Sequence, residues 1–156
     1  MKQHQPSPAQ AKAQKQPEQP GLQHVMHPQP ITLETESISH HKPPQLLAYK
    51  AAGKLQGKFA LITGGDSGIG RSVAVLFAKE GAHIAILYLE KEQQDANETK
   101  RIIEEEEGKT CLMFKGDVGE EDTCRQICHQ LATTFGRIDI LVNNAGEVIW
   151  PLESFG

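Results

Sequence analysis

The sequence predicts an α/β protein whose parallel sheet is doubly wound, with helices on both faces. From Leu55 onward, short apolar runs alternate with longer amphipathic ones, which is typical of repeated strand–helix–strand units. The first of them, residues 59–62, is apolar throughout, as expected for a strand that is covered on both faces. The predicted order is therefore strand, helix, strand, helix, strand, helix, strand.

The strands are placed by the apolar runs and by the turns that end them. The first is the run Phe59-Ala60-Leu61-Ile62, which stops at Gly64 and Gly65. The four predicted strands cover residues 59–62, 83–88, 110–114 and 138–142.

The segments between the strands carry apolar side chains at helical spacing, and each of them ends at a glycine. The three predicted helices cover residues 69–80, 93–107 and 120–135. The apolar face of the second helix is predicted to hold Ala96, Thr99 and Ile103. The apolar stripe of the third is predicted to hold Cys124, Ile127, Cys128, Leu131 and Phe135.

Composition limits the class of protein. The 156 residues suffice for one domain, and a formal net charge of -4 gives no support for nucleic-acid binding. Three cysteines, an odd number, do not form a disulfide framework. No stretch approaches the ~18 apolar residues of a membrane span, and no apolar signal segment opens the chain. We therefore expect a cytoplasmic protein with neither a membrane nor a nucleic-acid partner, and no metal site.

Residues 1–52 differ from the rest of the chain, because they hold eight of the nine prolines and many glutamines. They have too few apolar side chains to offset the entropy of ordering, so we expect a disordered or extended arm. The alternative is an arm that wraps a partner subunit, anchored by Val25, Met26, Ile31, Leu33, Leu46, Leu47 and Tyr49. The histidines lack the spacing of a zinc site, so we expect solvated side chains at His24, His27, His40 and His41.

The most informative segment lies between the first strand and the first helix and reads Thr63-Gly64-Gly65-Asp66-Ser67-Gly68-Ile69-Gly70. In such a motif Gly64 permits a tight turn, Gly68 lets a diphosphate approach the backbone, and Gly70 lets helix and strand pack closely. Free N–H groups at the helix N-terminus hold a phosphate without needing a lysine. The motif therefore predicts a dinucleotide site in a Rossmann-type fold.

Two alternatives to a dinucleotide site stay open. One is a glycine-rich turn that binds nothing, in which Ser67 or Asp66 caps the first helix. The other is a nucleoside-triphosphate binder, because the segment 65–72 fits the P-loop pattern except that Arg71 replaces the lysine. An arginine fork is not equivalent to the compact charge of a lysine, so the second alternative is minor.

Two further motifs follow the third and fourth predicted strands. They are Gly116-Asp117-Val118 and Asn143-Asn144-Ala145-Gly146. Together with the glycine motif, their order and spacing resemble the short-chain dehydrogenase/reductase family over residues 53–147. The lead-in at residues 54–58 and the form of the glycine motif resemble a bacterial subgroup of stress-related or aldehyde-reducing oxidoreductases with proline- and glutamine-rich arms.

The resemblance implies a Rossmann-type sheet with strand order 3-2-1-4 and the binding of NAD or NADP. Asp117 would hydrogen-bond the adenine ring with Val118 behind it, and Asn143 would be structural, tying the centre of the sheet. The alternative role for Asp117 is a cap on the third helix. The backbone on the nicotinamide-ribose side would come from Asn144, Ala145 and Gly146. The expected cofactor-binding residues are Thr63, Gly64, Asp66, Ser67, Gly68, Ile69, Gly70, Tyr88, Asp117, Val118, Asn144, Ala145 and Gly146.

The choice between NAD and NADP is left open by the sequence. Family members that prefer NAD usually carry an acidic residue at the end of the second strand, where this chain has Tyr88. Glu90 lies at about the spacing of a ribose ligand, but equally fits a solvated charge. Arg71 is nearby in sequence as a partner for a 2′-phosphate.

The family's catalytic residues, a serine and a Tyr-x-x-x-Lys pair, follow the fourth strand, and none is assigned here. Tyr49 and Tyr88 are the only tyrosines, and Gly53 and Glu92 stand at the lysine position after them.

We expect a fold truncated after the fourth strand, with an atypical tail at residues 148–156. The resemblance implies an NAD(P)-dependent oxidoreductase acting on a carbonyl or alcohol substrate, in a catalytically incomplete copy. The alternative is a non-catalytic dinucleotide-binding fragment. The resemblance implies a homo-oligomer for full-length relatives, but we do not extend this expectation to the present chain.

Overall fold

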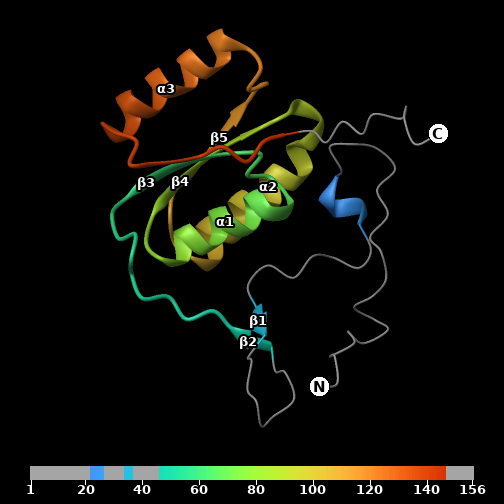
Figure 1. Cartoon of the computed structure of the whole chain (residues 1–156), viewed down its shortest axis with the longest axis vertical. Coiled ribbons are helices and arrows are strands. Elements are labelled where there is room, and N and C mark those ends of the chain that lie inside the picture. Colours follow the sequence, from blue (N-terminus) through green and yellow to red (C-terminus); the bar gives the residue numbers. More distant parts are fainter. Residues whose placement is uncertain (1–21, 27–33, 37–45, 147–156) are drawn as a thin grey trace, which may run out of the picture.

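A computed structural model of the chain describes residues 22–26, 34–36 and 46–146. Its main feature is a four-stranded parallel sheet in the order β5-β4-β3-β6 (Figure 1). Its strands are β3 (Phe59–Thr63), β4 (His83–Tyr88), β5 (Cys111–Lys115) and β6 (Ile140–Val142). Counted along the chain within this sheet, the order is 3-2-1-4, so the predicted topology is confirmed.

The helices that connect these strands lie close to their predicted positions. They are α1 (Gly68–Lys79), α2 (Gln93–Arg101) and α3 (Glu121–Phe135). A short turn, η2 (Glu90–Glu92), leads into α2, and a π-helical turn, η3 (Ile102–Glu106), continues it. The helix predicted at residues 93–107 is therefore one continuous segment whose last turn is widened.

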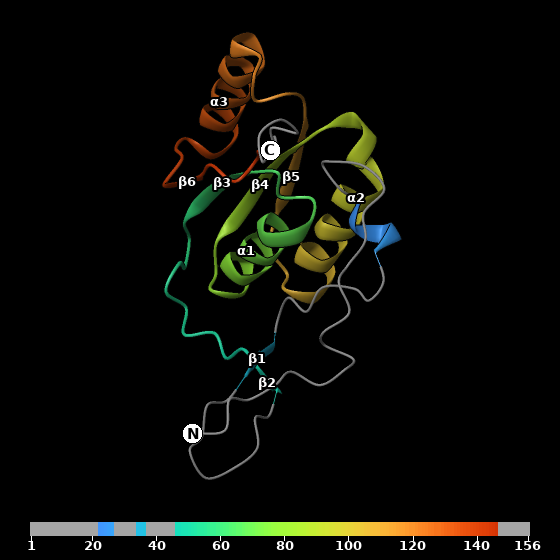
Figure 2. The ribbon, with the colours of Figure 1, turned by 45° about the vertical axis from the view of Figure 1, so that its right-hand side comes forward.

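Helices cover both faces of the sheet, with α1 and α2 on one side and α3 on the other (Figures 1 and 2). Alternate residues of β4 supply the two layers. Ile84 and Ile86 pack in the cluster under α1 and α2, whereas Ala85 and Leu87 pack in the cluster under α3. Burying one isoleucine side chain contributes roughly 1.5–3 kcal/mol. One central strand therefore joins both halves of the core, which explains why its sequence is apolar at every position from Ile84 to Leu87.

The predicted apolar face of the second helix is confirmed, since Ala96, Thr99 and Ile103 are all fully buried. The stripe predicted for α3 is too wide. Ile127 and Leu131 are buried, but Cys128 is exposed. The contact between α3 and the sheet is a narrow line of residues one helical turn apart, and Cys128 lies beside that line.

The described part of the N-terminal arm contains defined structure, where a disordered or extended arm is expected from composition. The turn η1 (Gln23–Val25) has Gln23 and Met26 buried, and β1 (Glu34–Glu36) pairs antiparallel with β2 (Leu46–Ala48). Hydrogen bonds from the backbone of Gln23 and His24 to Asp95 on α2, far away in the sequence, hold this turn in place. The expected anchors Ile31 and Leu33, the histidines His27, His40 and His41, and the tail at residues 148–156 lie outside the described residues.

The arm returns to the sheet beside the C-terminal end of α1. The buried carboxylate of Glu80 accepts hydrogen bonds from the Tyr49 hydroxyl and from the backbone N–H groups of Ala52 and Lys54. These bonds hold the pKa of Glu80 below its ordinary value, with the Tyr49 hydroxyl as the largest cause. In the parts of the chain that the structure describes, no helix has the length and apolar character to cross a membrane.

Candidate functional site

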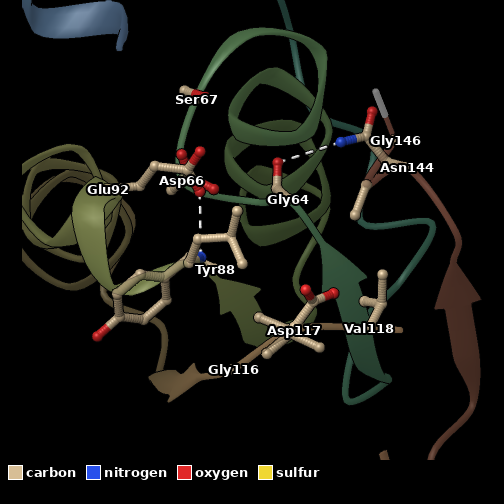
Figure 3. A pocket seen from close by; sticks show the side chains of 13 residues that line it. Gly64, Asp66, Ser67, Tyr88, Glu92, Gly116, Asp117, Val118, Asn144 and Gly146 are labelled. Atoms are coloured by element: carbon tan, nitrogen blue, oxygen red, sulfur yellow. Dashed lines mark hydrogen bonds between the residues drawn. The ribbon is translucent and has the colours of Figure 1, made fainter. Parts of the chain in front are cut away.

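A cavity of about 290 Å³ lies at the carboxyl ends of the parallel strands (Figure 3). Ligands bind at this edge of open α/β sheets, because the loops that follow the strands converge there. The lining comes from the loops after β3, β5 and β6 and from the segment between β4 and α2. It consists of Gly64, Asp66, Ser67, Leu87, Tyr88, Leu89, Glu92, Gly116, Asp117, Val118, Asn144, Ala145 and Gly146.

The glycine motif forms the tight turn that the sequence predicts. Gly64 has a φ of +63°, a conformation that side chains other than glycine rarely adopt. A Cβ atom at Gly70 would stand 1.9 Å from the Gly64 carbonyl oxygen, so the start of α1 packs directly on the turn. Ser67 is the N-cap residue of α1, but its side chain makes no capping hydrogen bond. Ser67 is therefore the N-cap residue by position, as one alternative from the sequence has it, but it supplies no capping bond.

The loop after β6 is tied to the glycine motif by Asn144. Its side-chain amide donates to the carbonyl oxygens of Thr63 and Gly64, both at 3.1 Å. Its backbone N–H donates to the Thr63 hydroxyl at 3.0 Å. Asn143, which the family resemblance names as the structural residue, is exposed instead. In this structure the bonds that join the loop after β6 to the glycine turn come from Asn144.

Two carboxyl groups lie together at the end of the cavity that faces α2. Asp66 is 1% exposed and Glu92 is 5% exposed, and Figure 3 shows their side chains close to each other. Burial raises the pKa of both carboxyls, and the neighbouring charge of Asp66 raises that of Glu92 further. Among the described residues, Asp66 Oδ2 has no hydrogen-bond partner. One residue of the cavity lining thus carries a buried carboxyl oxygen that has no hydrogen-bond partner among the described residues.

Glu92 lines the cavity, whereas the sequence reasoning considered only Glu90, either as a ribose ligand or as a solvated charge. Glu90 is exposed and pairs with Lys115, with 3.0 Å between Oε1 and Nζ. The turn η2 instead carries Glu92 back toward β4, where its Oε2 accepts a hydrogen bond from the Leu89 N–H at 3.1 Å. The expected spacing between the glycine motif and a ribose ligand counts residues along the chain, so it does not show where such a turn directs a side chain.

Tyr88 lines the cavity as predicted, and its hydroxyl donates to Gln93 Oε1 at 2.8 Å. Asp117 and Val118 also line it, on the side opposite the acidic pair (Figure 3). Asp117 Oδ1 accepts from the Gly119 N–H at 2.8 Å, which closes a local turn. The N-cap residue of α3 is Glu120, so the alternative that Asp117 caps this helix is wrong.

Four of the predicted cofactor-binding residues lie near the cavity without lining it. Ile69 is 77% exposed, and the hydroxyl of Thr63 is engaged with the loop after β6. The four residues are Thr63, Gly68, Ile69 and Gly70. Besides Glu92, the lining residues that the sequence reasoning left out are Leu87, Leu89 and Gly116. The sequence could have indicated these three residues, because each directly follows or precedes a predicted site residue.

Arg71 is fully engaged inside the protein. Its Nη2 donates to the Asp95 carbonyl at 2.9 Å and to Asp95 Oδ1 at 3.3 Å, and its Nε donates to the Asp66 carbonyl at 2.8 Å. The side chain is buried among these partners. An arginine held in this way is not directed at a phosphate in the cavity. The geometry therefore disfavours both the P-loop alternative and a role for Arg71 in holding a 2′-phosphate.

Comparison with known proteins gives a family match over most of this domain. Residues 58–154 match the model of the short chain dehydrogenase family. General stress protein 39 of Bacillus subtilis is 50% identical over 140 residues, which cover 90% of this chain and 44% of that protein. Glucose and ribitol dehydrogenase of Daucus carota is 44% identical over 138 residues, which cover 86% of this chain and 44% of that protein.

Solved structures of short-chain dehydrogenases are also similar to this chain. L-sorbose reductase of Gluconobacter frateurii, complexed with NADPH and L-sorbose, superposes with a TM-score of 0.56 at 39% identity, over 60% of this chain and 35% of that one. A short chain dehydrogenase of Burkholderia cenocepacia in complex with NADP gives a TM-score of 0.57 at 38% identity, over 60% of this chain and 38% of that one. The chain spans less than half the length of the relatives it matches.

The match to General stress protein 39 also includes part of the N-terminal arm. A match that covers 90% of this chain cannot be confined to residues 53–146, so it extends into the N-terminal arm. The similarity to that relative is therefore wider than the dinucleotide-binding segment.

Proposed function

This chain belongs to the short-chain dehydrogenase family, and we propose that its residues 53–146 bind NAD or NADP in the cavity at the carboxyl ends of the strands. The observation that carries the proposal is the buried carboxyl of Asp66, with one oxygen free of partners among the described residues, beside the start of α1. A carboxylate accepts hydrogen bonds from ribose hydroxyls, and the N-terminus of a helix attracts a diphosphate. Asp66 and Ser67, the residue directly before α1, both line this cavity.

The remaining lining residues fit the other parts of a dinucleotide. Asp117 and Val118 lie where an adenine ring would rest, with the carboxylate of Asp117 available as an acceptor. The backbone at Asn144, Ala145 and Gly146 lines the far end, for the nicotinamide ribose. A bound nicotinamide ring supplies the hydride acceptor or donor, while these residues orient it.

We propose that NAD is preferred over NADP. Asp66 and Glu92 place two carboxyl groups at the proposed ribose end, and a 2′-phosphate there would meet like charge after losing its water. Arg71, the arginine nearest to this loop in sequence, is committed to Asp95. The acidic character that the family usually places at the end of the second strand is supplied here by the glycine loop and η2.

Titration calorimetry of the full 156-residue chain tests the binding proposal. We expect NAD to bind more tightly than NADP and magnesium-ATP to give no heat. Asp66→Asn should weaken NAD binding by roughly 10-fold, the size of one hydrogen bond to a charged group. The matched control is Asp122→Asn, an exposed acid on α3, which should bind like the unaltered chain. Binding of magnesium-ATP without either nicotinamide nucleotide would overturn the proposal.

We propose further that the family's chemistry, hydride transfer with a carbonyl or alcohol substrate, is not completed by these 156 residues alone. Neither Tyr49 nor Tyr88 is followed by a lysine at the fourth position. An assay with NADH or NADPH and small aldehydes separates the two functions. Cofactor binding without turnover supports a dinucleotide-binding role for this chain, whereas turnover supports a complete oxidoreductase.

A further inference from the structure

The arm segment 22–26 docks on the layer that carries the glycine motif. Both carboxylate oxygens of Asp95, in the first turn of α2, accept hydrogen bonds from this segment. The backbone N–H of Gln23 donates to Oδ2 at 2.9 Å, and that of His24 donates to Oδ1 at 3.0 Å. The His24 ring Nδ1 lies 3.0 Å from Oδ2. His24, expected to be solvated, is therefore one of the contacts that fix the arm.

The same carboxylate is continuous with the cofactor loop. Asp95 is 1% exposed and also accepts from Arg71, whose Nε donates to the Asp66 carbonyl oxygen. The Thr99 hydroxyl donates to that carbonyl oxygen as well, at 2.8 Å. The backbone of Asp66 is thus held by side chains of α1 and α2, while its own Oδ2 is buried without a partner among the described residues. The arm and the proposed ribose acceptor share one buried network.

Gln23 makes a second link, directly to the first residue of α1. Its side-chain oxygen accepts a hydrogen bond from the Gly68 N–H, and its side chain is 4% exposed. The first N–H groups of a helix have no partner within it, and here the N-cap residue Ser67 provides no side-chain bond. A residue 45 positions away in the sequence therefore takes the place of the missing cap.

The contact is made from outside the cavity, because neither Gln23 nor Gly68 is among the residues that line it. Residues 22–26 of the arm therefore do not occupy the proposed cofactor position. The capping group is also a neutral amide. A carboxylate in its place would satisfy the same N–H but add a negative charge near a bound diphosphate.

We infer that Gln23 is a positioning residue for the cofactor: by capping α1 from the docked arm, it holds the glycine loop in the form that receives the dinucleotide. This inference rests on the proposed function. A loop that is ordered before binding loses less freedom on binding, so the affinity is higher. Coupling of this kind is reciprocal, so a bound cofactor must in turn favour the docked arm.

The test uses the full chain and two substitutions in the same turn. Gln23→Ala removes the cap, whereas Val25→Ala removes an exposed side chain that is 44% accessible. We expect Gln23→Ala to raise the Kd for NAD about fivefold, a factor typical of one lost helix cap, and Val25→Ala to leave it unchanged. Circular dichroism establishes that both variants retain the fold of the unaltered chain.

A second readout separates positioning from a merely structural role. Saturating NAD should slow amide hydrogen exchange at Gln23 and His24 in the unaltered chain, since their N–H groups bond to Asp95. If the unaltered chain binds NAD but Gln23→Ala binds it equally or more tightly, or exchange at these amides does not respond, the inference is wrong while the proposed function stands. If the unaltered chain binds neither nicotinamide nucleotide, the proposed function fails and the inference falls with it.

Discussion

The side-chain amide of Asn144 donates to the carbonyl oxygen of Gly64 at 3.1 Å and so joins the loop after β6 to the turn after β3. Both loops line the cavity, and they come from neighbouring strands of the sheet. The bond therefore sets the distance between the proposed diphosphate and nicotinamide ends of the site.

Asn144→Ala removes this bond and the one to the Thr63 carbonyl oxygen. We expect the free energy of unfolding to fall by about 1–3 kcal/mol, because two half-buried carbonyl oxygens lose a donor. Urea denaturation measures the change. Asn143→Ala is the matched control, since Asn143 is exposed, and it should be neutral. Equal destabilisation by both substitutions would contradict the assignment of the structural role to Asn144.

Gly70→Ala tests the close packing of α1 on the glycine turn. The added methyl group would stand 1.9 Å from the Gly64 carbonyl oxygen and 2.6 Å from Asn144 Nδ2, so the helix start must move. We expect a loss of at least about 3 kcal/mol, or failure to fold. Gly146→Ala, which meets nothing within 4 Å, is the comparison and should melt with the unaltered chain. A stable Gly70→Ala variant would show that the turn is looser than the geometry indicates.

Asp66 should make the stability of the chain depend on pH. Burial raises the pKa of its carboxyl in the folded state above the ordinary value of 3.8. Stability from the neutral form is therefore complete below that value and is lost as the pH rises through the folded pKa. Asp66→Asn, which cannot ionise, should be more stable than the unaltered chain at pH 7, and the difference should vanish towards pH 4.

Urea midpoints recorded from pH 4 to pH 7 measure this effect, with Asp122→Asn as the exposed control. The same Asp66→Asn variant should bind NAD more weakly, so stability and binding are expected to change in opposite directions. Parallel pH profiles for the two variants would remove the argument that burial of Asp66 is costly.

The outer edge of β6 should make this chain self-associate. Within the described residues β6 pairs with β3 alone, and Leu141 is 56% exposed on it. Open apolar strand edges pair with other chains, and a charged side chain there opposes such pairing. Leu141→Lys should therefore raise the monomer fraction in analytical ultracentrifugation. Ala132→Lys, which adds the same charge to the exposed side of α3, should not. A monomeric unaltered chain with a sharp, cooperative melt would refute the expectation.

Local patterns in the sequence were sufficient for the elements and for the identity of the main turn. The strand at residues 83–88 and the glycine turn between β3 and α1 were predicted where the structure has them. This works because the period of apolar residues and the conformational range of glycine are properties of short segments. The order of the four strands came from the resemblance to a family and not from periodicity, which is silent on how strands pair.

The details of the site depended on side-chain directions and on contacts between distant segments. Glu92 lines the cavity because η2 turns it toward β4, and it is Asn144 that bonds to the glycine turn. Composition alone also placed Gln23 in an unstructured arm.

The sequence by itself determined where this chain forms strands, helices and a phosphate-sized turn, because those depend on neighbours a few residues apart. Only the tertiary structure decided which acid lines the cavity, which carboxylate pairs with Arg71, and which residue caps α1. Each of these is fixed by a partner 24 or more residues away, or by a turn whose direction the spacing of residues does not encode.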